Sequence, residues 1–338
     1  MGRTLIICEK PTAAGKIASA LAKKRPSKQE LNGVEYYEFE RDGREMLVVP
    51  ALGHLFTLKN LKPMHDYPIY DIDWVPTYQV NKRAERAKAF AEAIQELAKD
   101  ADDFIGACDF DIEGEVIGFN ALRFLCGEDS VKKAKRMKFS ALTAQDLRQA
   151  YDNILPHLSF EMVDSGIARH FLDWYWGMNT SKALSSAVEA AHERFAKLSA
   201  GRVQSPTLKI LTEREKEIKA FKPEPFWVVG LLLELEGQEL KAEHAVPRFT
   251  DKAEAEKVRD VCQGKPARVS AIQTRQYRQP PPVPFDLGLL QSEAYRCFGY
   301  TPMRTQQLAQ NLYLAGLITY PRTSSQKLPP TINFTQII

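Results

Sequence analysis

The sequence predicts an α/β sheet domain, then a mostly helical region, a small α+β segment and a final pair of helices. Three observations predict this order. Strand-like apolar runs alternate with helix-like segments up to about residue 150. Residues 153–222 have a mostly helical pattern. Beyond residue 223, two neighbouring strand-like segments precede a helix, a further strand and a proline-rich linker.

The N-terminal elements are predicted from apolar runs and from helical periodicity. Phe90, Ile94 and Leu97 recur at helical spacing and predict an amphipathic helix. The expected strands are residues 4–8, 45–49 and 104–108, and the expected helices are residues 12–21, residues 83–99 and a helix that begins at about Glu115.

The later elements are predicted largely from residues that begin and end helices. Ser205 and Pro206 form a helix start, because serine caps free N–H groups and proline suits the first turn. Gly316 is the expected C-cap of the last helix. The other expectations are paired strands at 226–235 and 238–244, a further strand at 267–277, helices at 252–262, 286–297 and 302–315, and a stiff linker at 280–284.

Composition narrows the class of protein. Of the 338 residues, 44% are hydrophobic, which is enough to build cores, yet no apolar run approaches the roughly 20 residues of a membrane span. The chain enters a strand-like run at once, so we expect no signal peptide. The five cysteines are scattered without a CxxC pair, which indicates neither a zinc ribbon nor a disulfide framework. We therefore expect a cytoplasmic protein with no membrane partner.

The net charge of +3 says little about partners, but basic residues are locally dense. They crowd the stretch that holds Lys132, Lys133, Lys135, Arg136 and Lys138. This stretch is either a contact for nucleic acid or the solvated face of a helix or loop.

Three carboxylates cluster where a strand should end and a helix begin. If the backbone is still extended there, alternate side chains project together. Asp109, Asp111 and Glu113 would then repel one another and attract a divalent cation. Hard oxygen ligands of this kind suit Mg²⁺. The alternative is the start of a helix, whose dipole favours acids.

Two further segments carry side chains capable of chemistry. Glu9 and Lys10 follow the first strand, so they lie either in the ligand crevice at the carboxyl edge of a sheet or in a surface ion pair. Tyr320 is followed two residues later by Arg322. A phenol is a weak nucleophile at its ordinary pKa, and a guanidinium can stabilise the charge that develops when it attacks a phosphodiester. The alternative is an ordinary turn after a helix.

The Glu9 segment and the three acids together resemble a Toprim domain, and several other segments resemble the type IA DNA topoisomerases. Lys10 directly after Glu9 is similar to the topoisomerase III and archaeal branch. The chain departs from the common pattern at Phe110 and Ile112, where Pro and Arg are usual, and at His170, where many members have Arg. The resembling segments, in family order, are Gly53–Leu55, Ala168–Asp173, Leu198–Pro206, Pro282–Phe285 with Leu289–Gln291, and Gly316–Thr323.

The resemblance implies an ATP-independent isomerase that cuts and rejoins one DNA strand through a 5′-phosphotyrosine, and so relaxes or decatenates DNA. Its expected partner is the single-stranded segment of negatively supercoiled or catenated DNA in the nucleoid, and its expected cofactor is Mg²⁺. The residues that would carry these roles are Tyr320, Arg322, Glu9 and Lys10 in catalysis, Asp109, Asp111 and Glu113 at Mg²⁺, and Arg169, Asp173, Arg202, Gln204 and Ser205 along a groove for single-stranded DNA.

The resemblance also implies a division into four domains. A Toprim parallel-sheet domain would occupy residues 1–152, a helical groove domain 153–222, a small β-rich hinge domain 223–279, and the start of a helical tyrosine domain 280–338. Family members continue beyond this point, so the chain resembles an N-terminal fragment or a split subunit with a C-terminal companion. Two alternatives remain open: a Toprim nuclease or primase that uses the acids without Tyr320, and a non-catalytic fragment that binds single-stranded DNA.

Overall fold

The computed structural model describes residues 2–62, 67–192, 196–328 and 335, and the chain falls into two compact units. One unit combines residues 1–204 with residues 283–338, and the other comprises residues 205–282. Within the described residues, no helix combines the length and the apolar character needed to cross a membrane. The division into four domains, with boundaries after residues 152, 222 and 279, stays a prediction.

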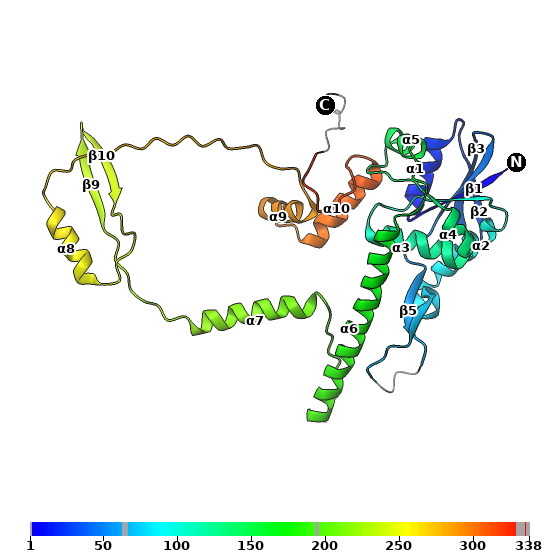
Figure 1. The fold of residues 1–338 in the computed structure, drawn as a ribbon, viewed down its shortest axis with the longest axis horizontal. Coiled ribbons are helices and arrows are strands. Elements are labelled where there is room, and N and C mark those ends of the chain that lie inside the picture. The colour runs from blue at the N-terminus through cyan, green and yellow to red at the C-terminus, as the bar shows by residue number, and fades with distance from the viewer. Residues whose placement is uncertain (1, 63–66, 193–195, 329–334, 336–338) are drawn as a thin grey trace. The chain divides into compact units, whose positions relative to one another are not determined.

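A six-stranded sheet organises the first unit (Figure 1). Its order is β2-β3-β4-β1-β7-β8. β1 pairs in parallel with β4 and β7, and β7 pairs in parallel with β8, while β2 and β3 add an antiparallel edge. The predicted α/β class is confirmed. The strands are β1 (Arg3–Cys8), β2 (Ser27–Leu31), β3 (Val34–Arg41), β4 (Arg44–Pro50), β7 (Asp103–Gly106) and β8 (Lys135–Arg136).

Helices cover both faces of this sheet, because alternate strand residues point to opposite faces. Leu5 and Ile7 of β1 pack with the helices α2 and α3, whereas Ile6 and Cys8 pack with α1 and α5. The helices of these layers are α1 (Pro11–Leu21), α2 (Arg86–Ala98), α3 (Ile112–Ala121), α4 (Glu128–Lys133) and α5 (Ala144–Asp152), with short 3₁₀ helices at Thr77–Gln79 and Lys82–Ala84 and a π-helix at Leu122–Cys126.

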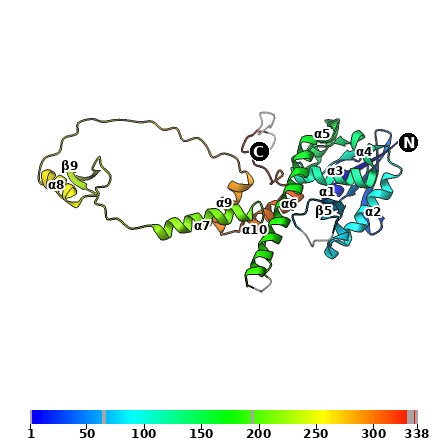
Figure 2. The same ribbon diagram turned by 60° about the horizontal axis from the view of Figure 1, so that its bottom comes forward.

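Four more elements complete the first unit. A β-ribbon of β5 (Phe56–Asn60) and β6 (Ile72–Pro76) extends from the sheet domain. Helix α6 (Phe160–His192) packs on α3 and runs away from the sheet in both views (Figures 1 and 2). The last helices of the unit are α9 (Leu287–Phe298) and α10 (Pro302–Ala315).

The second unit contains most of α7 (Gln204–Ala220), the antiparallel pair β9 (Gly230–Leu235) and β10 (Gln238–Glu243), and α8 (Lys252–Cys262). The paired strands and the helix confirm the sequence pattern. The strand predicted at 267–277 is wrong, because this segment has no regular structure. A strand is stable only beside a partner, and this segment has no partner strand among the described residues.

Candidate active site

The turn after α10 returns the chain to the sheet domain. Gly316 ends the helix in the left-handed conformation (φ 81°), which confirms the predicted C-cap. A Cβ at Gly316 would lie 3.3 Å from the Leu142 carbonyl oxygen, so the turn packs closely on the loop before α5. Tyr320 then donates its backbone N–H to the Ser140 carbonyl at 2.8 Å. These contacts place the Tyr320 side chain against the carboxyl edge of the sheet.

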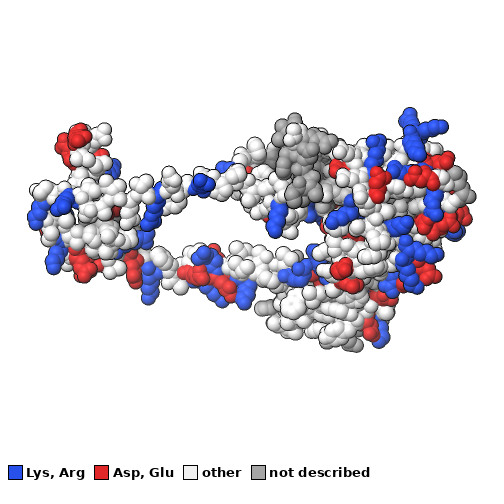
Figure 3. Space-filling model, turned by 45° about the horizontal axis from the view of Figure 1, so that its top comes forward, with Lys and Arg blue, Asp and Glu red and all other residues white. Residues whose placement is uncertain are grey.

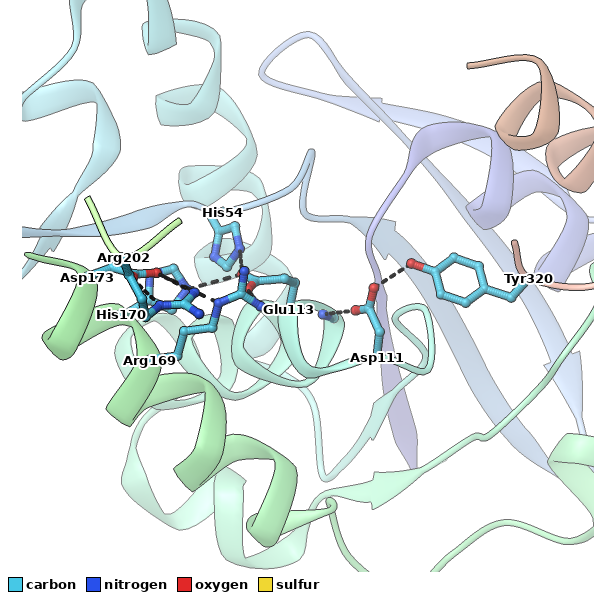
Figure 4. Close-up of polar contacts among 9 residues, drawn as sticks. His54, Asp111, Glu113, Arg169, His170, Asp173, Arg202 and Tyr320 are labelled. Atoms are coloured by element: carbon cyan, nitrogen blue, oxygen red, sulfur yellow. Dashed lines mark hydrogen bonds and ion pairs between the residues drawn. The ribbon is translucent and has the colours of Figure 1, made fainter. Parts of the chain in front are cut away.

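Two tyrosine hydroxyls reach two acids of the carboxylate cluster. The Tyr320 hydroxyl donates to Asp111 Oδ2 at 2.5 Å (Figure 4), and the Tyr313 hydroxyl donates to Asp109 Oδ1 at 2.9 Å. The two rings meet edge to face with centroids 5.2 Å apart. Burial raises the pKa of both phenols well above the ordinary value, and the acids beside them add to the shift. Both hydroxyls are therefore protonated donors in this structure.

The three acids do not project together, because α3 begins earlier than predicted. The helix starts at Ile112 rather than near Glu115. Asp111 is its N-cap and accepts from the Gly114 N–H at 2.7 Å, which supports the reading of these acids as a helix start. Glu113 lies on the first turn and faces another way. A Cβ at Gly114 would overlap the Asp109 carbonyl oxygen, so only glycine fits there.

Glu9 and Lys10 lie at the end of β1, beside Asp109. The Lys10 ammonium is 3.1 Å from Glu9 Oε1 and 2.6 Å from Asp109 Oδ2. Because Asp109 is only 3% exposed, this is a half-buried ion pair and not a surface one. Burial raises the pKa of Glu9, and the charge of Asp109 adds to the rise, while Lys10 opposes it.

A cleft of about 490 Å³ contains all four predicted catalytic residues. With the Gln306 amide turned so that its oxygen faces the guanidinium, this oxygen accepts from Arg322 Nη2 at 2.8 Å and from Nε at 3.0 Å. Gln306 of α10 thus orients Arg322. The cleft wall includes Tyr320, Arg322, Glu9, Lys10, Asp111 and Glu113.

Glu113 accepts from two histidines that sequence reasoning did not select. Its Oε2 lies 2.9 Å from His54 Nε2 and 3.2 Å from His170 Nε2 (Figure 4). Both hydrogen bonds hold the pKa of Glu113 well below its usual range, and the one from His170 has the larger effect on this pKa. Both histidines lie in segments that resemble a known family, but nothing in their local sequence indicates that they meet on one carboxylate.

An ion-pair chain extends from Glu113 along α6. Arg169 Nη1 is 3.4 Å from Glu113 Oε1, and Arg169 Nε is 3.8 Å from Asp173 Oδ2. Arg202 pairs with both oxygens of Asp173, at 2.6 and 3.2 Å. The structure therefore brings three of the five predicted groove residues together.

The other two predicted groove residues lie near the start of α7. Gln204 Oε1 accepts from the Ser199 hydroxyl at 3.3 Å, within the first unit. Ser205 belongs to the second unit, where it is the second residue of α7. Because α7 begins at Gln204, Ser205 lies inside the helix, and the prediction that it is the N-cap is wrong.

Arg136 is a further residue of this region that the sequence indicated only as part of a basic stretch. It is 1% exposed, and its Nε lies 2.5 Å from Glu115 Oε1. Its Nη2 donates to the Asp109 carbonyl at 3.2 Å and its Nη1 to the Met137 carbonyl at 2.7 Å. For Arg136, therefore, neither reading of the basic stretch applies, because this guanidinium is buried and holds the segment that carries the acids.

Comparison with known proteins identifies relatives for nearly the whole chain. A family model described as DNA topoisomerase matches residues 157–338, and a Toprim domain model matches residues 4–142. DNA topoisomerase 1 of Pyrococcus horikoshii is 48% identical over 334 residues, which is 99% of this chain and 48% of the relative. DNA topoisomerase 3 of Bacillus licheniformis is 29% identical over 97% of this chain and 44% of the relative.

A solved structure also resembles this chain over nearly its whole length. Full-length topoisomerase I from Thermotoga maritima matches with a TM-score of 0.64 and 25% identity, over 96% of this chain and 50% of that chain. The chain thus spans about half the length of the relatives that it matches.

Proposed function

This chain belongs to the DNA topoisomerase family, and from that premise we propose that it carries the strand-cutting centre of a type IA enzyme. Such an enzyme cuts one DNA strand, forms a 5′-phosphotyrosine and rejoins the strand, for relaxation or decatenation in the nucleoid. One observation carries the proposal: the Tyr320 hydroxyl lies 2.5 Å from Asp111, in one cleft with Arg322, Glu9 and Lys10.

The proposed step exchanges one phosphoester bond for another. The Tyr320 oxygen bonds to the phosphorus of the scissile phosphate while the bond from phosphorus to the 3′-oxygen breaks. The phenolic proton passes to Asp111, which already accepts its hydrogen bond. Glu9 gives a proton to the leaving 3′-oxygen and takes it back on rejoining. Because the number of phosphoester bonds is unchanged, ATP is not needed.

The positive groups of the cleft have distinct roles in this proposal. Arg322 stabilises the charge on the phosphate during attack, since its planar guanidinium suits paired phosphate oxygens. Lys10 contacts the scissile phosphate. Its ammonium pairs with Glu9 and Asp109 in this structure, so on DNA entry it would also contact the phosphate.

Asp109 and Asp111 would hold Mg²⁺, whose chemistry is to neutralise charge and to position the DNA ends for rejoining. Their carboxylate oxygens are the hard ligands that Mg²⁺ prefers. In this structure these oxygens accept from Lys10, Tyr313, Tyr320 and Gly114. Glu113, the third predicted ligand, would join them only by giving up its two histidine partners.

Replacement of Asp111 by Asn should weaken Mg²⁺ binding at least tenfold, because one of the two carboxylates proposed to hold the ion is lost. Asparagine caps a helix about as well as aspartate, so α3 should be unaffected. Titration calorimetry with Mg²⁺ on the wild type and on Asp111→Asn measures the difference. Equal affinities would rule out Asp111 as a ligand.

We expect single-stranded DNA to run past Arg169 and Arg202 of the ion-pair chain. On the face shown in Figure 3, lysines and arginines are interspersed with acids, and no broad basic field covers the sheet domain. Binding should therefore rest on few phosphate contacts and weaken as salt is added. In a plot of log K against the logarithm of the salt concentration, each contact should contribute about −0.7 to the slope. A slope near zero would contradict this path.

The function is tested with a single-stranded oligonucleotide labelled at its 3′ end. After denaturation we expect the labelled piece to remain attached to the protein, because it carries the phosphate bonded to Tyr320. The assay compares this chain alone with the chain plus a companion that covers the C-terminal half of its relatives. A Toprim nuclease would release free ends, and a DNA-binding fragment would leave the strand intact in both conditions; either result would overturn the proposal.

A further inference from the structure

Three side chains from three separate elements converge on one point beside the cleft. Among the described residues, His54, Glu113 and His170 form the one group of His, Cys, Asp or Glu side chains whose ligand atoms all lie within 4.8 Å of one another. His54 follows β4, Glu113 lies on α3 and His170 lies on α6. Asp109 and Asp111 are not members of this group, so it shares only Glu113 with the predicted Mg²⁺ ligands.

The spacing of these ligand atoms is compatible with a single metal ion. Both histidines direct Nε2 at the same oxygen of Glu113, at 2.9 and 3.2 Å. Ligand atoms that bind one Zn²⁺ at about 2.0–2.1 Å lie roughly 3 Å apart, so small shifts would admit the ion. The other oxygen of Glu113 is 3.4 Å from Arg169 Nη1, which leaves Oε2 as a single ligand atom.

The surroundings hold the two imidazoles in place. The His54 and His170 rings meet edge to face with centroids 5.1 Å apart, and Trp74 packs on His170 at 5.3 Å. The turn that presents His54 contains Leu52 at φ 58° and Gly53 at φ 83°. A leucine in the left-handed region is unusual, and such strain persists only where the surroundings enforce it.

We propose that His54, Glu113 and His170 bind a borderline divalent metal ion, with Zn²⁺ as the best fit. Two imidazoles with one carboxylate suit Zn²⁺ far better than Mg²⁺, which prefers oxygen ligands alone. The three side chains are each about 30% exposed, so a fourth position is open to water or to a phosphate oxygen. Glu113 also lines the cleft, but no bond-making step of the proposed strand cutting uses these three side chains.

The test is titration of Zn²⁺ alone into the whole chain by calorimetry, and of Co²⁺ with visible spectroscopy. Cys262 and Cys297 are exposed and could bind either ion, so both are first replaced by serine. We expect one Zn²⁺ per chain that excess Mg²⁺ does not displace, and a Co²⁺ spectrum of the intense tetrahedral type. His54→Gln and His170→Gln should each lower the affinity at least tenfold.

Two matched controls make the outcome decisive. His157 is an exposed histidine of the same unit, and His157→Gln should leave Zn²⁺ affinity unchanged. Asp111→Asn should also leave it unchanged although it weakens Mg²⁺ binding. Absence of Zn²⁺ binding in the wild type, or equal affinity in both site variants, would overturn the proposal. If a site variant fails to fold, the wild type alone still decides: a Co²⁺ spectrum like that of the aqueous ion would overturn the proposal.

Discussion

Replacement of Tyr320 by Phe should abolish the covalent protein–DNA adduct completely, with little loss of DNA binding. The substitution removes the attacking oxygen and its hydrogen bond to Asp111, while the ring can keep its edge-to-face contact with Tyr313. The backbone bond from Tyr320 to Ser140 also remains. The measurement is the amount of labelled strand retained on denatured protein, with fluorescence anisotropy for binding.

Tyr313→Phe is the matched control, because its hydroxyl lies on the neighbouring acid and its ring touches that of Tyr320. Tyr313 is 1% exposed and is not in the cleft wall, so a phosphate cannot reach it without rearrangement. We therefore expect Tyr313→Phe to retain the adduct. Retention of the adduct in Tyr320→Phe, or its loss only in Tyr313→Phe, would show that Tyr320 is not the nucleophile.

The fold was predictable wherever the pattern is local. The helix at 302–315 and its Gly316 cap are marked by a proline, apolar spacing and a glycine, and all three lie within one stretch of sequence. The expected strand at 267–277 shows the limit of this approach. Its composition favours a strand, but a strand also needs a neighbour, and no local pattern reveals whether one is present.

The candidate site was predictable as a set of residues but not as a set of contacts. Spacing indicated Asp109, Asp111 and Glu113 as one cluster. The three-residue difference in where α3 begins turns Glu113 toward His54 and His170. Helix ends are the least certain feature of any sequence pattern, so this divergence could not be foreseen.

Long-range contacts account for the residues that were missed. Tyr313 fits the apolar spacing of α10, and only the packing of that helix on the sheet domain brings its hydroxyl to Asp109. Arg136 stands in a basic stretch whose other members are exposed lysines. Its burial follows from the pairing of β8 with β7, which places it beside Glu115.

Replacement of Glu9 by Gln should slow strand cleavage by about 10²–10⁴-fold, the usual contribution of a general acid. Glutamine keeps the shape of the side chain but cannot give a proton to the 3′-oxygen. Burial and the charge of Asp109 raise the pKa of Glu9, so the acid stays protonated to higher pH than an ordinary glutamate does. Single-turnover cleavage should therefore fall as pH rises through this raised pKa.

The pH profile separates a proton donor from a residue with a structural role only. In the wild type, the protonated form of Glu9 decreases with pH, and the cleavage rate should decrease with it; in Glu9→Gln this limb of the profile should disappear. Glu40→Gln, an exposed glutamate on β3, should retain both the rate and the profile. A Glu9→Gln enzyme that is slow but keeps the falling limb would show that another group gives the proton. In that case Glu9 would act only by holding Lys10, from which it is separated by 3.1 Å.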